Sequence, residues 1–383
     1  MTMSLRSTAL EPGPEDYRGH GVDRVMHAFR RSLPVYGLVY LTFLIILFFS
    51  LLLPNTFPTA LNFRVLASGK AVLAILALAV TVPMAAGKID VSIGYAVGLW
   101  HIVVLVLQTQ FGVPMPLAIV IVLAGGVLVG IVNGLLVELA QVDAFVATLG
   151  TGTLLYAFSL LLTGGAQIVD TKGAIPSLFW KIASTDILGL PGPFLFVVAL
   201  AVVMWIVFDY LPVGRYLYAC GANPRAAELN GIPRRRYVLA SFIVSGTLPA
   251  IAGVFLASRL QVGQANVSLD YLLPALVAAF LGSTTIRPGR VNPWGTVVGI
   301  VILAVGISGI EQFGAQFWVE PLFNGLTLVI AITIASWAGR RRVTALERHQ
   351  GATPAPPGAL PADGPDNGPT ASVPAPAEEG PRR

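Results

Sequence analysis

Long apolar runs follow one another through most of this chain, and they constrain its fold more than any other feature of the sequence. Only 11% of the 383 residues are Asp, Glu, Lys or Arg, while 55% are hydrophobic. Soluble domains carry about 25% charged residues, and a water-soluble core cannot hide this much apolar surface. We therefore expect an integral membrane protein.

Each run is long enough to cross a bilayer as a helix, because a hydrocarbon core of about 30 Å takes about 20 apolar residues. Lipid offers backbone amides no partner outside helices and closed barrels, and the runs do not alternate. The predicted fold is all-α, a polytopic membrane helical bundle of about ten transmembrane helices. Counts of nine and eleven helices remain open, because the segment Ala144–Thr163 is rich in Thr and Gly and is either continuous or broken. The spans are expected near residues 34–53, 66–86, 91–110, 115–139, 144–163, 193–211, 237–257, 269–285, 293–313 and 318–339.

The basic residues predict how the bundle is oriented. With the N-terminus inside, 19 of the 24 Lys and Arg fall in segments on the inner side, as the positive-inside rule requires. Both termini are then cytoplasmic. The predicted parts are a cytoplasmic N-terminal segment (1–33), a transmembrane domain (34–342) and a Pro/Ala/Gly-rich cytoplasmic tail (343–383), whose composition favours disorder.

Several classes of function find no support in the sequence. One cysteine, Cys220, and four separated histidines give no metal-ligand spacing, so no metal site is expected. The net charge of +5 is attributed to topology rather than to nucleic-acid binding. No acid, base and nucleophile lie in a catalytic pattern, so the chain is not expected to be an enzyme. No G-x-x-x-x-G-K-[ST] motif is present, so ATP is not expected to bind to this chain.

Small residues at a spacing of four indicate closely packed helices. The segment from Gly126 to Val132 also resembles the segment from Gly295 to Val301, five spans later. Spans five apart face opposite ways, so the echo favours an inverted five-plus-five repeat, with chance as the alternative. The glycines expected to pack helices are Gly126, Gly130, Gly134, Gly295 and Gly299.

A short helix is predicted between the sixth and seventh spans. Asn223 suits an N-cap, Pro224 the first helical position, and Gly231 the residue that ends the helix. A helix this short is marginal alone in water. Two interpretations remain open: a loop helix resting on the membrane surface, or a helix that docks into the groove of a partner.

Three segments together resemble a known family. They are GKIDVSIGYAVGL (Gly87 to Leu99), VDAFVATLGTGTLLYAFSLLLTGG (Val142 to Gly165) and GANPRAAELNGI (Gly221 to Ile232). In this order the chain is similar to the permease subunits of bacterial sugar-type ABC importers, those for ribose, xylose and galactose. Lys88, Asn230 and the stretch Leu281 to Asn292 depart from the family pattern, and the last departure weakens inferences about substrate and gating.

The resemblance implies a permease that moves a monosaccharide into the cytoplasm through the bacterial plasma membrane. It implies a coupling helix over 223–231 that docks on a separate cytoplasmic ABC ATPase, which binds the ATP. The other implied partners are an extracytoplasmic sugar-binding protein and a second permease, identical or similar. The coupling residues carried over are Gly221, Asn223, Pro224, Arg225, Ala226, Ala227, Glu228 and Gly231.

Polar groups at membrane depth are costly and mark candidate pathway residues. Asp90, Ser92 and Asn133 are predicted to line the translocation pathway, with a helix cap for Asp90 and helix-to-helix bonding for Asn133 as the structural alternatives. His101 and Asn324 carry the same pair of alternatives. Charged rims outside the membrane suit a docking protein or are ordinary solvated loops. These rim residues are Asp170, Lys172, Lys181, Asp186, Glu311 and Glu320.

Two other functions remain as alternatives. An ion-coupled secondary transporter would require an acidic relay within the spans, and the interior acids are few. An ABC permease for branched-chain amino acids or nucleosides shares much of the same pattern.

Overall fold

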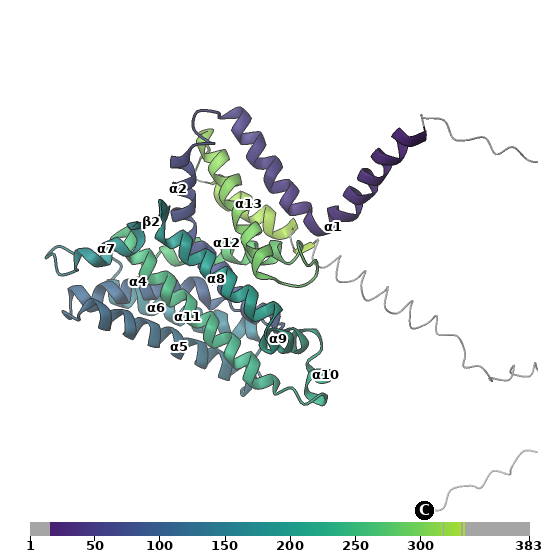
Figure 1. Cartoon of the computed structure of the whole chain (residues 1–383). Coiled ribbons are helices and arrows are strands. Elements are labelled where there is room, and N and C mark those ends of the chain that lie inside the picture. The colour runs from purple at the N-terminus through teal and green to yellow at the C-terminus, as the bar shows by residue number, and fades with distance from the viewer. Residues whose placement is uncertain (1–15, 317, 331, 334–383) are drawn as a thin grey trace, which may run out of the picture. The chain divides into compact units, whose positions relative to one another are not determined.

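The computed structural model describes residues 16–316, 318–330 and 332–333 (Figure 1). The chain divides into two compact units, Met1–Gly339 and Arg340–Arg383. The second unit, which includes the predicted disordered tail 343–383, lies outside the described residues, as do residues 1–15. The first described helix already begins at Asp16.

Helices make up most of the described part of the first unit, so the predicted all-α membrane bundle is confirmed. The strands have two residues each and pair in two antiparallel ribbons, β1 with β4 and β2 with β3. A further apolar helix, without a label in Figure 1, covers Val319–Ile330. The elements are α1 (Asp16–Leu52), α2 (Ala60–Gly69), α3 (Ala71–Ala85), α4 (Ser92–Thr109), α5 (Met115–Glu138), α6 (Ala144–Thr163), β1 (Ile168–Val169), α7 (Ser177–Ser184), β2 (Asp186–Ile187), β3 (Leu190–Pro191), α8 (Gly192–Asp209), α9 (Pro212–Ala222), α10 (Pro224–Leu229), α11 (Arg234–Leu260), β4 (Val262–Gly263), α12 (Val267–Gly282) and α13 (Pro293–Gln312).

The number of spans differs from the expected ten. Within the described residues, seven helices are long and apolar enough to cross a membrane, or eight if the bent pair α2 and α3 counts as one span. The segments expected as the eighth and tenth spans form the shorter apolar helices α12 and Val319–Ile330. The segment Ala144–Thr163 is one continuous helix, α6.

The second expected span is broken. Residues 66–86 were expected to form one helix, but α2 ends at Gly69, α3 begins at Ala71, and the two axes differ by 46°. The carbonyl of Gly69 accepts a hydrogen bond from Arg259 Nη1 at 2.7 Å. The side chain of a distant helix therefore satisfies a backbone group at the break, which the local sequence does not reveal.

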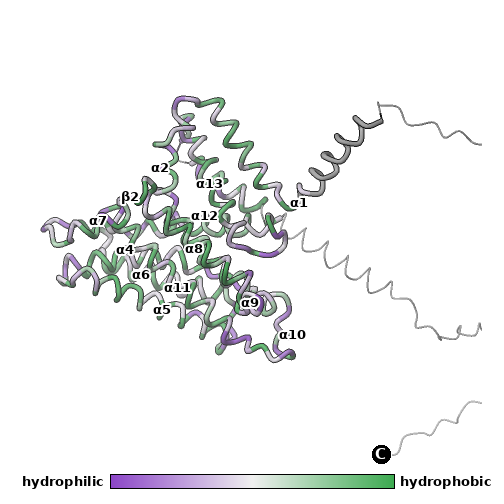
Figure 2. Tube along the Cα trace, in the orientation of Figure 1, coloured by the Kyte–Doolittle hydropathy of each residue, from purple (hydrophilic) through white to green (hydrophobic). Residues whose placement is uncertain are grey.

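α3 and α11 lie at the centre of the bundle. All residues of α3 except Met84 are buried. α11 packs against α3, α4 and α5, and α3 packs against α12 and α13. Large apolar side chains instead stay exposed along α1, α5 and α6, where Figure 2 shows mainly hydrophobic colouring along α5 and α6. Such exposed apolar surface fits lipid rather than water.

The glycines expected to pack helices lie at two contacts. Gly126, Gly130 and Gly134 of α5 face α11, where a Cβ added to Gly126 would lie 2.7 Å from Ala250 Cβ and from the Gly246 carbonyl oxygen. On α13, a Cβ on Gly295 would collide with the Gly282 carbonyl of α12. Backbones approach this closely only where side chains are absent.

The helix contacts have the pattern that the inverted repeat predicts. In such a repeat α3 is equivalent to α11, α4 to α12, and α5 to α13. The contacts of α11 with α4 and α5 therefore correspond to those of α3 with α12 and α13. The contact of α4 with α5 corresponds to that of α12 with α13. The repeat remains a prediction that this arrangement supports.

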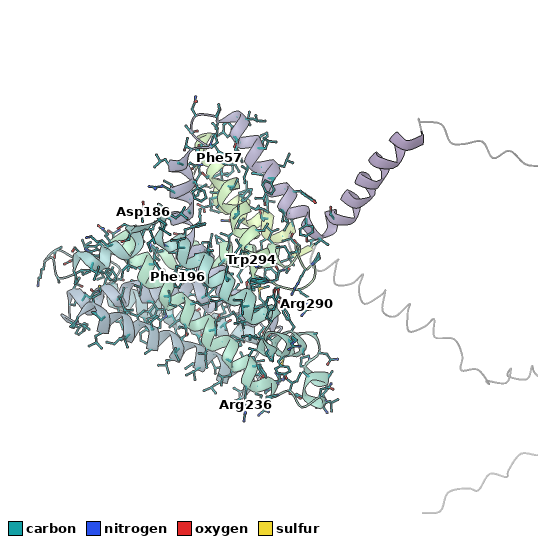
Figure 3. The ribbon with its side chains drawn as sticks, viewed as in Figure 1. Phe57, Asp186, Phe196, Arg236, Arg290 and Trp294 are labelled. Atoms are coloured by element: carbon teal, nitrogen blue, oxygen red, sulfur yellow. The ribbon has the colours of Figure 1, made fainter. Side chains whose placement is uncertain are left out.

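Polar segments collect at two ends of the helices. We call one the α10 end, formed by α9, α10 and the loops that follow α3, α5 and α12. We call the other the α7 end, formed by α2, α7 and the two ribbons. In Figure 3, Arg236 and Arg290 lie at the α10 end and Asp186 lies at the α7 end.

Candidate functional site

The predicted short helix is present at the α10 end and is capped at both of its ends. Asn223 has an extended backbone, and its side chain accepts a hydrogen bond from the Ala226 N–H at 3.0 Å. Pro224 occupies the first position of the six-residue helix α10. Gly231 takes a positive φ of 76°, and the Ile232 N–H returns to the Ala227 carbonyl at 3.0 Å. These local contacts explain why so short a helix forms here.

The residues of α10 differ in their exposure. Ala227 is buried against its own chain, and its part in coupling stays a prediction. Its small size lets α10 pack closely on the bundle. Arg225 and Glu228 are exposed, and Leu229 is 76% exposed. Leu229 is not among the coupling residues predicted from the sequence; it places an apolar side chain on the otherwise polar outer surface of α10.

A glycine contact holds the segment before α10 against the membrane helices. Gly221 packs on residues 85–87, and a Cβ added to it would lie 2.8 Å from the Gly87 nitrogen. Gly87 has a φ of 73°, so the turn after α3 requires a glycine there as well. This turn leads directly into Asp90 and α4.

An ion-paired cluster holds α10 from its other side. Arg234 donates from Nη1 to Glu138 Oε1 and from Nε to Glu228 Oε1, both at 2.8 Å. The side chain of Glu138 is only 3% exposed, against 42% for Glu228. The hydrogen bond from Arg234 lowers the pKa of the Glu228 carboxyl, so Glu228 remains charged well below neutral pH. The sequence analysis missed both Glu138 and the role of Arg234.

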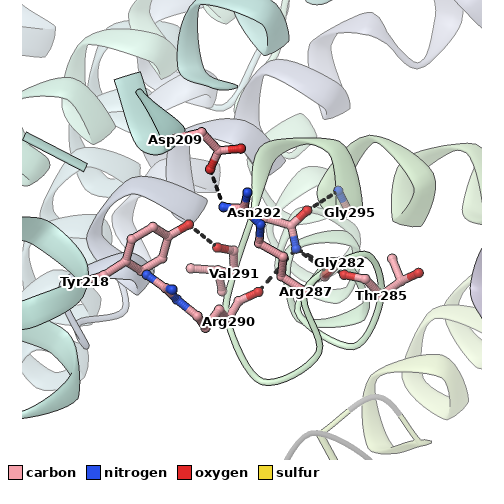
Figure 4. A network of polar contacts seen from close by, with 9 residues as sticks. All are labelled: Asp209, Tyr218, Gly282, Thr285, Arg287, Arg290, Val291, Asn292 and Gly295. Atoms are coloured by element: carbon pink, nitrogen blue, oxygen red, sulfur yellow. Dashed lines mark hydrogen bonds and ion pairs between the residues drawn. The ribbon is translucent and has the colours of Figure 1, made fainter. Parts of the chain in front are cut away.

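The loop between α12 and α13 is fixed beside α9 (Figure 4). Arg287 pairs with Asp209, and the Tyr218 hydroxyl donates to the Val291 carbonyl at 2.6 Å. Arg290 lies 4.0 Å above the centre of the Tyr218 ring, in cation–π geometry. Although this stretch departs from the family pattern, its contacts place it firmly at the α10 end.

Asn292 gives that loop a defined end. Its Oδ1 accepts from the Gly295 N–H at 2.7 Å and so caps α13. Its Nδ2 donates to the carbonyls of Gly282, Thr285 and Arg290. One side chain therefore joins the end of α12 to the start of α13.

The three candidate pathway residues lie in one buried hydrogen-bond network. Asp90 Oδ1 accepts from the Ser92 N–H at 2.9 Å and the Ser92 hydroxyl at 2.6 Å, and Asp90 Oδ2 accepts from the Ser245 hydroxyl at 2.6 Å. Asn133 donates to Ser92 at 2.9 Å and accepts from Thr151 at 2.7 Å. The network joins α4, α5, α6 and α11. All of these contacts lie within the chain, at the start of α4 and between helices, which agrees with the structural alternative; the pathway role stays a prediction.

The two other polar candidates lie apart from this network. His101 Nε2 accepts from the Gln264 N–H at 3.1 Å and so joins α4 to the chain just after β4. Asn324 is buried, and its Oδ1 has no hydrogen-bond partner among the described residues.

An open groove of about 350 Å³ lies at the α7 end. Arg64 pairs with Asp186 at 3.2 Å, and both side chains are nearly half exposed. Arg259 donates to the Gly69 carbonyl and has no ion-pair partner in the described part of the chain. The groove is lined by Arg64, Val65, Ser68, Gly69, Ala183, Ser184, Asp186, Pro191 and Arg259.

Comparison with known proteins identifies the class to which these features belong. A family model described as the permease component of branched-chain amino acid transport systems matches residues 63–332, which includes α10, the Asp90 network and both arginines of the groove. The chain belongs to this permease family. No solved structure matches the permease.

Curated relatives are similar over most of the chain. The autoinducer 2 import system permease protein LsrD of Escherichia coli strains SMS-3-5 and K12, and of Shigella flexneri, is 32% identical over 279 residues. These matches cover 70% of this permease and 84% of each relative. The relatives are transporter subunits rather than enzymes. This permease is accordingly a multi-pass membrane subunit of an ATP-binding cassette importer.

Proposed function

We propose that this permease imports an uncharged polar solute of the monosaccharide class, driven by a separate cytoplasmic ATPase that docks on α10. The observation that carries the proposal is α10 itself. It is capped at both ends, held to the bundle from two sides, and presents Arg225, Glu228 and Leu229 outward. A helix fixed in this way offers a partner a rigid surface at low entropic cost.

The solute class follows from the charges of the bundle and from the resemblance to sugar permeases. Asp90 and Glu138 are the buried carboxylates within the described residues, and each already has donors from its own chain. A zwitterionic amino acid would require charged partners along its path, because unpaired charges at membrane depth are costly. A polyhydroxyl solute requires only hydrogen bonds. The relatives' names assign autoinducer 2 as the solute of their own systems.

The α7 end is the proposed docking face for an extracytoplasmic solute-binding protein. Arg259 offers a cation without an ion-pair partner in the described part of the chain, and Asp186 and Arg64 offer exposed charges beside it. Charged rims of this kind set orientation and association rate more than affinity. A second permease, identical or similar, would complete the pore.

A substitution at Leu229 tests the docking role of α10. Leu229→Glu places a charge at the centre of the proposed interface without touching a buried contact. We expect loss of co-purification with the ATPase and loss of ATP-dependent uptake, because a charge buried in an interface without a partner is strongly unfavourable. The measurement is ATPase recovery with the tagged permease from membranes.

Leu188→Glu is the matched control, since Leu188 is 97% exposed but lies at the α7 end. It should leave ATPase recovery unchanged. Normal recovery and uptake with Leu229→Glu would contradict the docking role. Uptake that continues without ATP but stops with an uncoupler would show an ion-coupled transporter instead.

A further inference from the structure

We propose that Arg234 and Glu138 are positioning residues that tie α10 to the membrane helices α5 and α11, so that a displacement of α10 moves this helix pair as one body. The proposal rests on the docking role proposed for α10. It adds the route by which a force applied there enters the bundle.

The geometry of Arg234 is the first step. Arg234 is the first residue of α11, and it contacts Glu138, the last residue of α5, and Glu228 of α10 through two different nitrogens. A guanidinium is planar, with donors in a fixed fork. It therefore holds both carboxylates in fixed positions relative to each other, which a single ammonium on a flexible stem does not do.

Of the two ion pairs of Arg234, the pair with Glu138 is the more stable one, because Glu138 is buried. Its side chain is 3% exposed, and its second oxygen, Oε2, has no hydrogen-bond partner among the described residues. Arg234 is its only ion-pair partner in that part of the chain. Separating the two would leave an unpaired carboxylate out of water, which is strongly unfavourable. The end of α5 and the start of α11 must therefore move together.

Deeper in the bundle the same two helices interlock. Gly126, Gly130 and Gly134 of α5 lie against the backbone and side chains of α11, with no room for a Cβ. A packed interface of this kind transmits a shift along its length rather than absorbing it. The pair α5 and α11 thus extends from the ion cluster to the groove at the α7 end, where Arg259 lies in the last turn of α11.

The contact with Glu228 is the one exposed to a partner. Glu228 is 42% exposed and is next to Leu229. Water competes for its carboxylate, so this ion pair is weaker than the buried one. When a partner moves α10, the displacement passes from Glu228 to Arg234, and from Arg234 to Glu138 at the end of α5.

The experiment measures the solute imported per ATP hydrolysed by the assembled importer in proteoliposomes. Glu138→Gln removes the buried charge with little change of shape. We expect ATPase binding and ATP hydrolysis to persist while import per ATP falls by about fivefold or more, the range of a coupling free energy between sites. Arg236→Gln, at an exposed arginine two residues after Arg234, should leave the ratio unchanged.

A double variant separates coupling from stability. The single variant leaves the largely buried Arg234 without Glu138 as its partner. Glu138→Gln combined with Arg234→Gln replaces both members of that ion pair, so thermal stability should recover if the single variant is less stable, while import per ATP stays low. A ratio equal to wild type in both variants, with import and hydrolysis falling only in proportion to the assembled complex, would overturn the proposal. A wild-type permease that recovers no ATPase would instead overturn the function on which the proposal rests, and the proposal with it.

Discussion

Asp90 lies in a buried hydrogen-bond network, with partners both near to it and far from it along the chain. Its hydrogen bond from the N–H of Ser92, the first residue of α4, is local, because acceptor and donor are two residues apart. Its bond to Ser245 spans 155 positions, and no local pattern indicates it. Its other hydrogen bonds come from the hydroxyls of Ser92 and Ser245. The network satisfies both carboxylate oxygens from within the chain, which favours a structural role for Asp90.

Removing one donor from this network should lower stability. Ser245→Ala leaves Asp90 Oδ2 buried without its hydroxyl donor, which we expect to cost about 1–3 kcal/mol. The measurement is the unfolding midpoint in detergent, together with the KM for uptake. KM should stay unchanged, because every polar partner of the network in the described residues comes from a neighbouring helix of the same chain.

Ser241→Ala is the matched control. The Ser241 hydroxyl is buried too, but it donates to the Val238 carbonyl of its own helix at 2.6 Å. Its loss should cost less, about 0.5–1.5 kcal/mol. A changed KM with Ser245→Ala at unchanged stability would assign the network to the translocation pathway instead.

At the scale of elements, local signals predicted the caps of α10 and the continuous apolar helices. Asn223, Pro224 and Gly231 act within a few residues of one another, so both ends of α10 can be predicted from the local sequence. The break at Lys70 was missed because its stabilising donor, Arg259, is 190 positions away from Gly69. The burial of Ala227 likewise depends on neighbours that only the fold supplies.

The contact between α5 and α11 makes an element-scale prediction. Gly130→Ala places a methyl group 2.6 Å from Ile243 Cα, so the helices must separate or shift. We expect a loss of about 1–3 kcal/mol, as for other overpacked cores, measured by unfolding in detergent.

Gly150→Ala provides the comparison. Nothing lies within 4 Å of a Cβ at Gly150, which is exposed on α6. Alanine is favoured over glycine in a helix by about 1 kcal/mol, so this variant should be neutral or more stable. Equal effects of the two substitutions would show that α5 and α11 are not tightly packed.

At the scale of the whole molecule, composition was sufficient to predict a membrane bundle, but not the number of spans. The cytoplasmic placement of both termini rests on the basic residues and stays a prediction. Hydropathy alone does not show that α12 has 16 residues or that α2 and α3 meet at an angle. The predicted orientation places the α10 end in the cytoplasm. Basic residues are the reason, with Arg215, Arg225 and Arg234 to Arg236 all at this end.

Thiol labelling of intact cells tests this orientation. In a Cys220→Ser background, an impermeant thiol reagent should modify Lys172→Cys, in the chain between α6 and α7. It should not reach Arg215→Cys, on α9. Both sites are exposed in the structure, so lysed cells should show modification of both. Labelling of Arg215→Cys alone in intact cells would invert the predicted topology.

The cluster around Arg234 also limits how far the docking helix can be treated as a module. A transplant of α10 alone into another permease carries the outward surface, with Arg225 and Leu229, but leaves Arg234 and Glu138 behind. The same holds for Gly221, which needs its counterpart Gly87. The smallest set of residues that could be exchanged is therefore the segment 221–234 together with positions 87 and 138. These two positions are remote from the segment in sequence but contact it in space.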